Sequence, residues 1–456
     1  MNFNLLAAGL LASFGVITAC ALTYIAVSLF SHDVHVQRYG TKGAKSAERL
    51  AAAKRRRTLH VLYAAIISLV ASVGVAVLVH ELDKTDKLPA DLWLMSLPAM
   101  VSLVLFGFSI KYRRKTLIMS SSAVIVLALA FSALLINSYY RLYPTFYSFI
   151  GIENRIAVMA ARQATTFQRA KTAGPSANIE SQLYGFELST AGHLSPLTIP
   201  GKVSQFNGRP GWAYVPAVAR GNVKLPVIIL LAGTPGAPSD WLAGGGLQQT
   251  LDTFAKNHHG ITPMVFVVDE NGSQFNDTEC VDSPRGNVET YLTQDVPNYI
   301  ESHYNVLTTP NNWAIGGLSL GGMCGIMLTL RHPQTFGYFA DFGGEPAPEV
   351  GSEAKTISTL FNGSQREYEM HDPATLLKTH HYANVGGYFV VGKGDSLKLV
   401  ASMQTLYDLS KHAGANTVME TIGGEHDFGV WQQSFKDALP WLANQVGATQ
   451  CAASCN

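Results

Sequence analysis

A serine between glycines, in the run Gly317-Leu318-Ser319-Leu320-Gly321, is the feature of this chain best suited to chemistry. It follows an apolar run typical of a buried strand. The pattern G-x-S-x-G is typical of a sharp strand-to-helix turn that exposes the serine hydroxyl. Its glycines remove the Cβ atoms that would clash in such a turn. Because a serine hydroxyl is a weak nucleophile at neutral pH, this interpretation requires a base and an acid elsewhere in the chain.

Asp395 and His426 provide an acid and a base after the serine. Asp395 follows a strand-like run at 387–392, and His426 follows another at 417–422, with a helix-like stretch at 397–412 between them. The imidazole would take the serine proton, and the carboxylate would fix the imidazole tautomer and stabilise its charged form. The order serine, acid, histidine, each just past a strand, is that of the α/β-hydrolases.

Other acids and histidines are alternatives for these roles. Asp341 and Glu345 follow the strand after the serine helix and are fallback acids. Asp427 adjoins His426, where the backbone direction disfavours contact with the imidazole. His412 ends the helix-like stretch, where a surface role is expected. Chain order disfavours four further histidines: His303, His332, His380 and His381.

A second apolar run, residues 225–231, indicates a strand buried on both faces. It leads into a glycine-containing turn at 232–236, which would present a backbone N–H opposite that of Leu320. We expect the N–H groups of Leu320 and Thr234 to stabilise an oxyanion, with Gly233 as the alternative to Thr234. A plain tight turn without a catalytic part is the competing interpretation.

Residues from about 200 to 445 resemble the esterase D family of α/β-hydrolases, the branch that includes the mycolyltransferases. The resemblance rests on residues 227–233, Glu289-Thr290-Tyr291-Leu292, Tyr304, Gly316 to Gly322, Arg331-His332-Pro333, Phe336, Gly392 to Asp395, Gly424-Glu425-His426, Trp431 and Leu439-Pro440. It implies an α/β-hydrolase fold, a mostly parallel sheet flanked by helices. It also implies Ser319 as nucleophile, Asp395 as acid and His426 as base.

The first third of the chain contains four apolar runs of about the length that crosses a bilayer. They are Leu5–Phe30, Leu59–Val79, Leu92–Ile110 and Leu117–Tyr139. None has a polar face, which argues against buried helices of a soluble protein. They explain why 47% of the 456 residues are hydrophobic and only 14% are charged. The sequence therefore predicts a four-helix transmembrane region.

The charges between these runs predict the orientation of the chain. Eight basic residues lie between the first two runs and four between the last two, against two in the middle connection. The positive-inside rule then places the region after Tyr140 outside the cytoplasm. The basic run at 54–57 is interpreted as a topology signal or lipid contact, with no nucleic-acid partner. The first run lacks a basic start, so we expect neither a cleaved signal peptide nor lipidation of Cys20.

The chain divides into a membrane region (1–140), a juxtamembrane linker (141–200), a catalytic domain (201–447) and a C-terminal tail (448–456). Four cysteines lie in the outward-facing part, where disulfides persist. We expect the pairs Cys280–Cys324 and Cys451–Cys455, with four free thiols as the alternative. Cysteine–histidine spacing does not indicate zinc, and glycine-rich loops do not indicate a nucleotide, so no cofactor or metal is expected.

The sequence thus predicts a membrane-anchored serine esterase that forms an acyl-enzyme. Its substrate would be an ester-bearing small molecule or a lipid or glycolipid of the cell envelope, with membrane lipids as partners. Two alternatives stay open: an acyltransferase, resembling the mycolyltransferases, that moves the acyl group to a sugar hydroxyl, and a non-catalytic membrane sensor or binding protein with a hydrolase fold. The oligomeric state does not follow from the sequence.

Overall fold

The computed structural model describes residues 5, 8–38, 92–111, 115–143, 145–146, 192–220, 223–274 and 276–449, with five single positions between 63 and 74. The chain forms two units, Met1–Phe146 and Tyr147–Asn456. The linker predicted at 141–200 and the tail predicted at 448–456 lie largely outside the described residues, as do Cys451 and Cys455.

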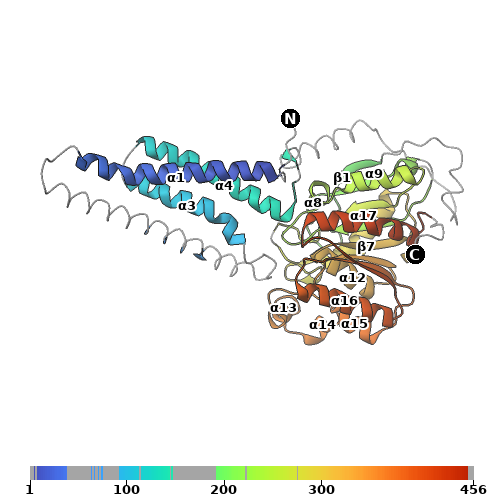
Figure 1. Ribbon diagram of the computed structural model, residues 1–456. Coiled ribbons are helices and arrows are strands. Elements are labelled where there is room, and N and C mark those ends of the chain that lie inside the picture. The colour runs from blue at the N-terminus through green and yellow to red at the C-terminus, as the bar shows by residue number, and fades with distance from the viewer. Residues whose placement is uncertain are drawn as a thin grey trace. The chain divides into compact units, whose positions relative to one another are not determined.

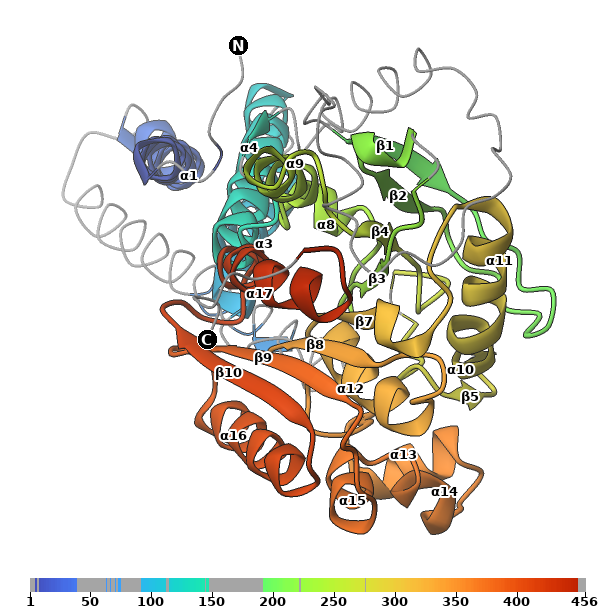
Figure 2. The same ribbon diagram turned by 90° about the vertical axis from the view of Figure 1, so that its right-hand side faces the viewer.

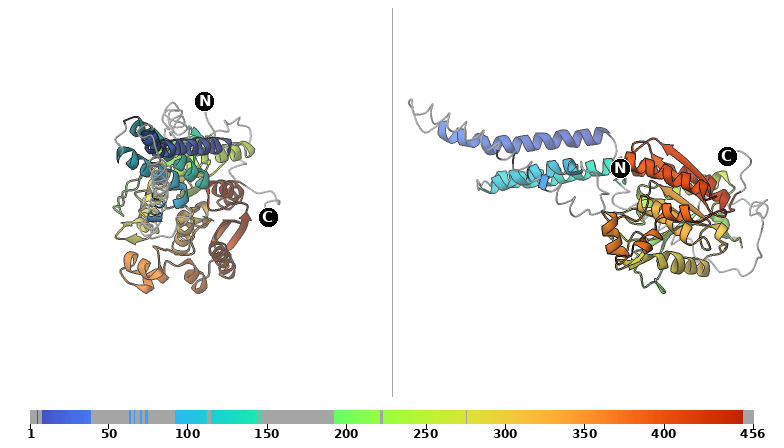
Figure 3. Two further views of the ribbon diagram at one scale, coloured as in Figure 1. Left: turned by 60° about the vertical axis from the view of Figure 1, so that its left-hand side comes forward. Right: turned by 90° about the horizontal axis from the view of Figure 1, so that it is seen from below.

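Three long helices form the described part of the first unit: α1 (Ala8–Arg38), α3 (Leu92–Lys111) and α4 (Lys115–Tyr140). They run alongside one another (Figures 1 and 3). A small apolar cluster joins the three helices and contains Ile25, Leu105, Leu117 and Val124. Large apolar side chains such as Met119 and Val126 remain exposed on α4.

A polar contact also joins α3 to α4. Ser109 Oγ and Ser121 Oγ lie 2.6 Å apart in a buried hydrogen bond. Serines that hydrogen-bond between helices are common where helices pack within membranes. Of the described helices, α4 is the one that is both long and apolar enough to cross a bilayer. Its 26 residues rise about 39 Å, against a hydrocarbon core of about 30 Å.

The second predicted span, Leu59–Val79, lies mostly outside the described residues. The four-span region therefore stays a prediction, and the structure supports one candidate span by length and composition.

An eight-stranded sheet in the order β1-β2-β4-β3-β7-β8-β9-β10 forms the centre of the second unit. The strands are β1 (His193–Leu197), β2 (Gly211–Val215), β3 (Val227–Leu231), β4 (Met264–Val267), β7 (Trp313–Leu318), β8 (Tyr338–Phe342), β9 (Gly386–Gly392) and β10 (Asn416–Ile422). The six strands from β4 to β10 in this order are parallel, whereas β2 pairs antiparallel with both β1 and β4. A separate short hairpin joins β5 (Asp282–Ser283) to β6 (Gly286–Asn287).

Helices cover both faces of this sheet (Figure 2). One face carries α8 (Asp240–Ala243), α9 (Leu247–Asn257) and α17 (Phe428–Gln445). The other carries α11 (Val296–His303), α12 (Leu320–Arg331), α15 (Pro373–Thr379) and α16 (Leu397–His412). Shorter helices complete the unit: α10 (Val288–Thr290), α13 (Glu353–Leu360), α14 (Gln365–Glu369), and the π turn Tyr291–Asp295. This arrangement is the α/β-hydrolase-like fold expected from the sequence.

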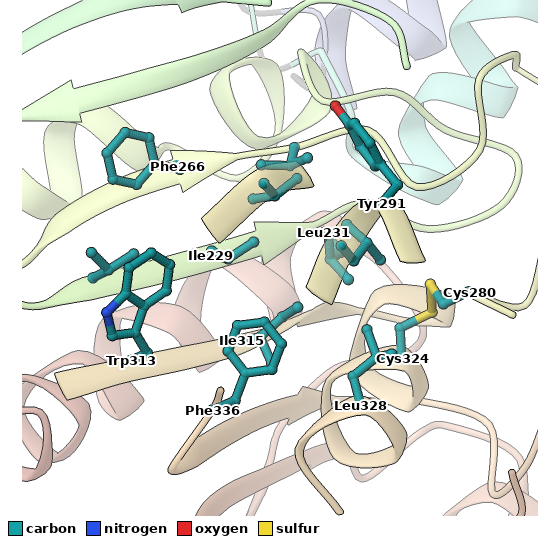
Figure 4. Packing of buried hydrophobic residues seen from close by; sticks show 14 of the residues in the cluster. Ile229, Leu231, Phe266, Cys280, Tyr291, Trp313, Ile315, Cys324, Leu328 and Phe336 are labelled. Carbon is teal, nitrogen blue, oxygen red and sulfur yellow. A yellow bond between two sulfur atoms is a disulfide. The ribbon is translucent and has the colours of Figure 1, made fainter. Parts of the chain in front are cut away.

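Apolar residues on both sides of the parallel strands form the core. All five residues of β3 are buried, as its uninterrupted apolar sequence predicts for a strand covered on both faces. In Figure 4, Ile229 and Leu231 of β3 lie with Trp313 and Ile315 of β7 in the cluster beneath α12. On the opposite face, Trp241 packs edge-on against aromatic rings of β8 and α17.

The predicted disulfide between Cys280 and Cys324 is present, with a sequence separation of 44 (Figure 4). Cys280 belongs to the loop after β4, and Cys324 lies in the second turn of α12. The bond therefore ties this loop to the helix that begins directly after Ser319. Cys20 is a free, exposed cysteine of α1.

Candidate active site

Ser319 occupies the single position between the end of β7 and the start of α12. Its backbone has φ 52° and ψ −123°, a conformation that is rare and strained for a residue with a side chain. Its N–H donates to the carbonyl of Phe342 on the neighbouring strand at 3.0 Å. The carbonyl of Ser319 accepts from the N–H of Gly322 at 2.8 Å, which begins the helix. The chain thus reverses at Ser319, as the motif predicts.

Two glycines of the motif allow the backbone to approach β3 closely. A Cβ on Gly317 would collide with the carbonyl oxygen of Leu231. A Cβ on Gly321 would lie 2.6 Å from the carbonyl oxygens of Leu231 and Ala232. Both positions therefore need glycine because other backbone fills the space, and the end of β3 comes to lie next to Ser319.

Ser319, His426 and Asp395 are joined by hydrogen bonds although they lie far apart in sequence. Ser319 Oγ lies 3.0 Å from His426 Nε2, and His426 Nδ1 lies 3.2 Å from Asp395 Oδ2. A carboxylate accepts only, so Nδ1 carries the proton in the neutral ring. Nε2 is then left as the acceptor for the serine hydroxyl. This arrangement can remove a proton from Ser319 during attack on a carbonyl.

The neighbours of His426 account for its orientation. The ring of Trp431, on α17, meets the imidazole edge-on with centroids 4.9 Å apart. Asp427 turns the other way, because its Oδ1 accepts from the N–H of Val430 and caps α17. The aspartate next to the base thus serves the following helix, and Asp395 is the carboxylate at the imidazole.

The other histidines considered from the sequence are engaged elsewhere. His303 and His412 lie at helix ends, 2.8 Å from the carbonyl oxygens of Tyr299 and Asp408 respectively. His332 pairs with Glu289 at 2.6 Å. His380 and His381 are exposed beyond the end of α15.

Asp341, a fallback acid, lies at the end of β8 behind the turn that carries Ser319. It is fully buried, and its Oδ1 accepts from the N–H of Gly344 at 2.7 Å. Burial, with a smaller contribution from the nearby carboxyl of Glu345, the other fallback acid, raises the pKa of Asp341 to about 7. The backbone of Gly322 passes so close that a Cβ there would collide with Asp341 Oδ1. Asp341 therefore packs behind the turn, and Asp395 is the acid that contacts the imidazole of His426.

The turn expected to provide an oxyanion donor lies against Ser319. A Cβ on Gly233 would come within 3.3 Å of Ser319 Cβ, so this backbone borders the nucleophile. Thr234 follows, and its peptide bond to Pro235 is cis. Leu320 is the first residue of α12, where a helix has N–H groups without helical partners. Leu320 is thus joined directly to Ser319, and the residue before Thr234 borders it.

Two residues that the sequence analysis did not single out contact this turn. Glu270 Oε2 accepts from the N–H of Ala232 at 3.2 Å, and Asn271 Nδ2 donates to Thr234 Oγ1 at 2.8 Å. The sequence carries a signal for them, because three polar residues, Asp269 to Asn271, follow the apolar run that contains β4. Carboxyl ends of parallel strands meet at one edge of a sheet. The contact of Glu270 and Asn271 with the turn at Thr234 depends on the pairing of β4 with β3, which the local sequence does not reveal.

A buried ionic cluster was also missed, at the far end of α12. Glu289 accepts from Arg331 Nε at 2.7 Å, and its carboxylate also contacts His332 and His371. Burial alone would raise the pKa of Glu289, but the hydrogen bonds from His332, His371 and Arg331 hold it far below the ordinary value. The cluster joins α10 to the end of α12 and to the segment before α15.

Comparison with known proteins gives one family. The family described as "Putative esterase" matches residues 207–442. A protein of Corynebacterium glutamicum described as uncharacterized is 32% identical over 408 residues, covering 87% of this chain and 92% of that protein. Such coverage must include part of the apolar first third of the chain.

Two further proteins are similar over shorter lengths. The diacylglycerol acyltransferase/mycolyltransferase Ag85C of Mycobacterium leprae is 35% identical over 89 residues, which is 19% of this chain and 26% of that protein. A ferulic acid esterase of known structure aligns with a TM-score of 0.48 and 20% identity, covering 56% of this chain and 99% of the esterase.

We expect Asp341→Asn to remove a pH dependence of stability. Because burial raises the pKa of Asp341 from 3.8 to about 7, the native state favours the protonated acid. Its contribution to stability is full below the unfolded pKa and is lost as the pH rises toward 7. At about 1.4 kcal/mol per pKa unit, about two pKa units of this effect lie above pH 5, so the wild-type protein should lose roughly 3 kcal/mol relative to the variant between about pH 5 and about pH 8.

Unfolding of both full-length proteins in detergent, at about pH 5 and about pH 8, measures this difference. Asp408→Asn, at an exposed position of α16, is the control and should show no such change. Equal pH slopes for wild type and Asp341→Asn would contradict the assignment.

Proposed function

Because this chain belongs to the putative esterase family and is a serine hydrolase, we propose that it is a membrane-anchored esterase that acts through an acyl-enzyme on an ester-bearing lipid or glycolipid. The observation that carries the proposed chemistry is the hydrogen-bonded chain Ser319–His426–Asp395. Each of the three residues follows a parallel strand, so the carboxyl edge of one sheet brings them together.

In the first half of the reaction, Ser319 Oγ attacks the ester carbonyl carbon while His426 Nε2 takes its proton. The negative charge that develops on the carbonyl oxygen is stabilised by the N–H groups of Leu320 and Thr234. Asp395 keeps the imidazole in the productive tautomer and stabilises its charged form. His426 then gives the proton to the departing alcohol, which leaves an acyl group on Ser319.

In the second half, His426 takes a proton from water, and the resulting nucleophile attacks the acyl carbonyl. The same two N–H groups stabilise the second oxyanion. Collapse of this intermediate breaks the bond to Ser319 Oγ, which recovers its proton from His426. The product is a carboxylic acid, and the enzyme returns to its starting state.

We propose that the first unit, Met1–Phe146, attaches the protein to a membrane. The length and composition of α4, the exposed apolar side chains and the serine contact between α3 and α4 support it. The four apolar runs and the basic residues of their first and third connections support four spans with the second unit outside the cytoplasm. A site anchored there has lipid or glycolipid esters of the envelope within reach.

Acyl transfer is a second candidate, because one similar protein is a diacylglycerol acyltransferase/mycolyltransferase. Both reactions share the acyl-enzyme and differ in whether water or an alcohol accepts the acyl group. Product analysis with and without a sugar acceptor decides between them: an acyl sugar formed at the expense of free acid would favour transfer.

We expect Ser319→Ala to abolish ester hydrolysis and labelling by a fluorophosphonate, since the variant lacks the attacking oxygen. Loss of the nucleophile in triad enzymes lowers turnover by about 10⁶. Membranes that contain either protein can be labelled directly and separated on a gel. Ser410→Ala removes a buried hydroxyl on α16 and is the control that should still label. Normal labelling of Ser319→Ala would exclude Ser319 as the nucleophile.

We expect Asp395→Asn to lower kcat by about 10⁴, because an amide in this place favours the wrong imidazole tautomer. Asp341→Asn is the control, because Asp341 also lies at the carboxyl edge of the sheet but contacts Gly344 and not the imidazole. This variant should keep most of the wild-type kcat. Rates of hydrolysis of a p-nitrophenyl ester measure both. A large loss in Asp341→Asn with Asp395→Asn near normal would reverse the assignment of the acid.

We expect the second unit to face the cell exterior. Arg and Lys cost several kcal/mol at the bilayer centre and resist export in short loops, so the two basic connections should stay in the cytoplasm. Protease added to spheroplasts should digest the second unit, and alkaline phosphatase fused after Asn456 should be active. Protection of this unit, together with a fluorescent cytoplasmic reporter at the same position, would overturn the topology and the envelope substrate.

A further inference from the structure

The turn at Ala232–Pro235 has little means of holding its own shape. Gly233 has no side chain, and Pro235 has no N–H to donate. Thr234 lies between them and is the residue whose N–H would face the oxyanion. An oxyanion donor is effective only when it is fixed before charge develops, because reorientation during the reaction removes the benefit. The turn therefore needs support from its neighbours.

That support comes from Glu270 and Asn271, in the loop after β4. β3 and β4 are adjacent parallel strands with Leu230 opposite Val267, so their carboxyl ends lie together. Asn271 is fully buried and has two amide hydrogens. One is placed to donate to Thr234 Oγ1 at 2.8 Å, and the other to Glu270 Oε1 at 3.0 Å.

Glu270 holds the other side of Gly233. Its Oε2 accepts from the N–H of Ala232 at 3.2 Å, so the pair Glu270–Asn271 grips the residues on both sides of the glycine. The pair is itself anchored, because Thr278 Oγ1 donates to the carbonyl of Glu270 at 2.7 Å. Asp269, the residue before Glu270, accepts two hydrogen bonds from the guanidinium of Arg209.

Glu270 can lie behind this turn without placing a charge there. Burial and the neighbouring carboxylate of Asp269 together raise the pKa of Glu270 well above its ordinary value, whereas the N–H of Ala232 and the charge of Arg209 act in the opposite direction. The raised pKa favours the neutral acid over the carboxylate. A negative charge at this point would oppose the oxyanion, and a neutral acid does not.

On the proposed function, we infer that Asn271, supported by Glu270, is the positioning residue of the oxyanion turn. Its amide holds the Thr234 side chain, and because Thr is β-branched with few χ1 positions, holding Oγ1 also holds the backbone of Thr234. The N–H of Thr234 then stays directed at the site where the carbonyl oxygen becomes negative. Neither Asn271 nor Glu270 touches the reacting atoms.

The test compares Thr234→Val with Thr234→Ser. Valine keeps the shape of threonine but cannot accept the Asn271 hydrogen bond, whereas serine can. Removal of a whole oxyanion donor costs about 10²–10³ in kcat, so a donor that is loosened should cost roughly 10–100-fold. We expect Thr234→Val to lose this factor in kcat with KM near the wild-type value, and Thr234→Ser to recover most of it.

Asn271→Ala removes the same hydrogen bond and leaves Thr234 intact. The test can therefore be made even if Thr234→Val does not fold. Asn271→Ala should show a loss similar to that of Thr234→Val. Because Asn271 acts through Thr234, the double variant should be no slower than Thr234→Val alone. Multiplied losses in the double variant would mean that Asn271 acts independently of Thr234 and would overturn the inference.

A trifluoromethyl ketone, whose serine adduct carries an oxyanion, gives a readout that a merely structural role would not change. Its affinity should fall in parallel with kcat/KM across the variants. Thr417→Val removes a buried hydroxyl that pairs with Ser410 at 2.9 Å, and is the matched control. It should lower thermal stability while leaving kcat and ketone affinity unchanged.

The outcomes separate this inference from the proposed function. If wild-type protein neither hydrolyses esters nor reacts with fluorophosphonate, the proposed function fails and the inference falls with it. If wild type is active and Thr234→Val matches it in kcat and ketone affinity, the inference alone is wrong. The same holds if Thr234→Ser is as slow as Thr234→Val.

Discussion

The backbone of Ser319, held at φ 52° between β7 and α12, is the constraint on which the rest of the site depends. Such a conformation costs on the order of 1–3 kcal/mol and persists only where the surrounding structure imposes it. Here β3 packs so closely that Gly317 and Gly321 cannot carry side chains, and the Ser319 N–H is bound by Phe342 of β8. The strained turn is therefore fixed from both neighbouring strands, and its hydroxyl is left for His426.

The helix that follows Ser319 is held near both of its ends. Cys324, in its second turn, is bonded to Cys280, and Arg331, its last residue, pairs with the buried carboxylate of Glu289. The first of these links also reaches the loop after β4, which contains Glu270 and Asn271. The nucleophile and the turn at Thr234 are thus connected through one set of contacts, so a change in that loop is expected to affect both oxyanion donors together.

The order of residues along the chain was sufficient to predict Ser319, Asp395 and His426 as a catalytic triad. Each follows a strand that its own apolar run predicts. Strands β3, β9 and β10 and helix α16 lie where the sequence predicts them, to within two residues. The contacts of Glu270 and Asn271 were missed because they depend on β4 lying beside β3, which no local pattern encodes. The same is true of Glu289 and His371, which meet across 82 residues of sequence. The membrane spans rest on composition, and the second lies mostly beyond the described residues.

The carboxyls around Ser319 differ in what they contact: Glu270 and Asp341 accept backbone N–H groups, and Asp395 accepts from His426. Glu270 lies behind the turn at Thr234, and Asp341 lies behind the start of α12. Burial raises the pKa of both carboxyls above the ordinary value. In the protonated form they fill space and accept backbone N–H groups without adding negative charge near the oxyanion. Asp395 instead lies at Nδ1 of His426, the ring nitrogen opposite the one that faces Ser319. Its charge is therefore placed where the imidazolium forms and is kept away from the oxygen that becomes negative, which is the separation that acyl transfer through a serine requires.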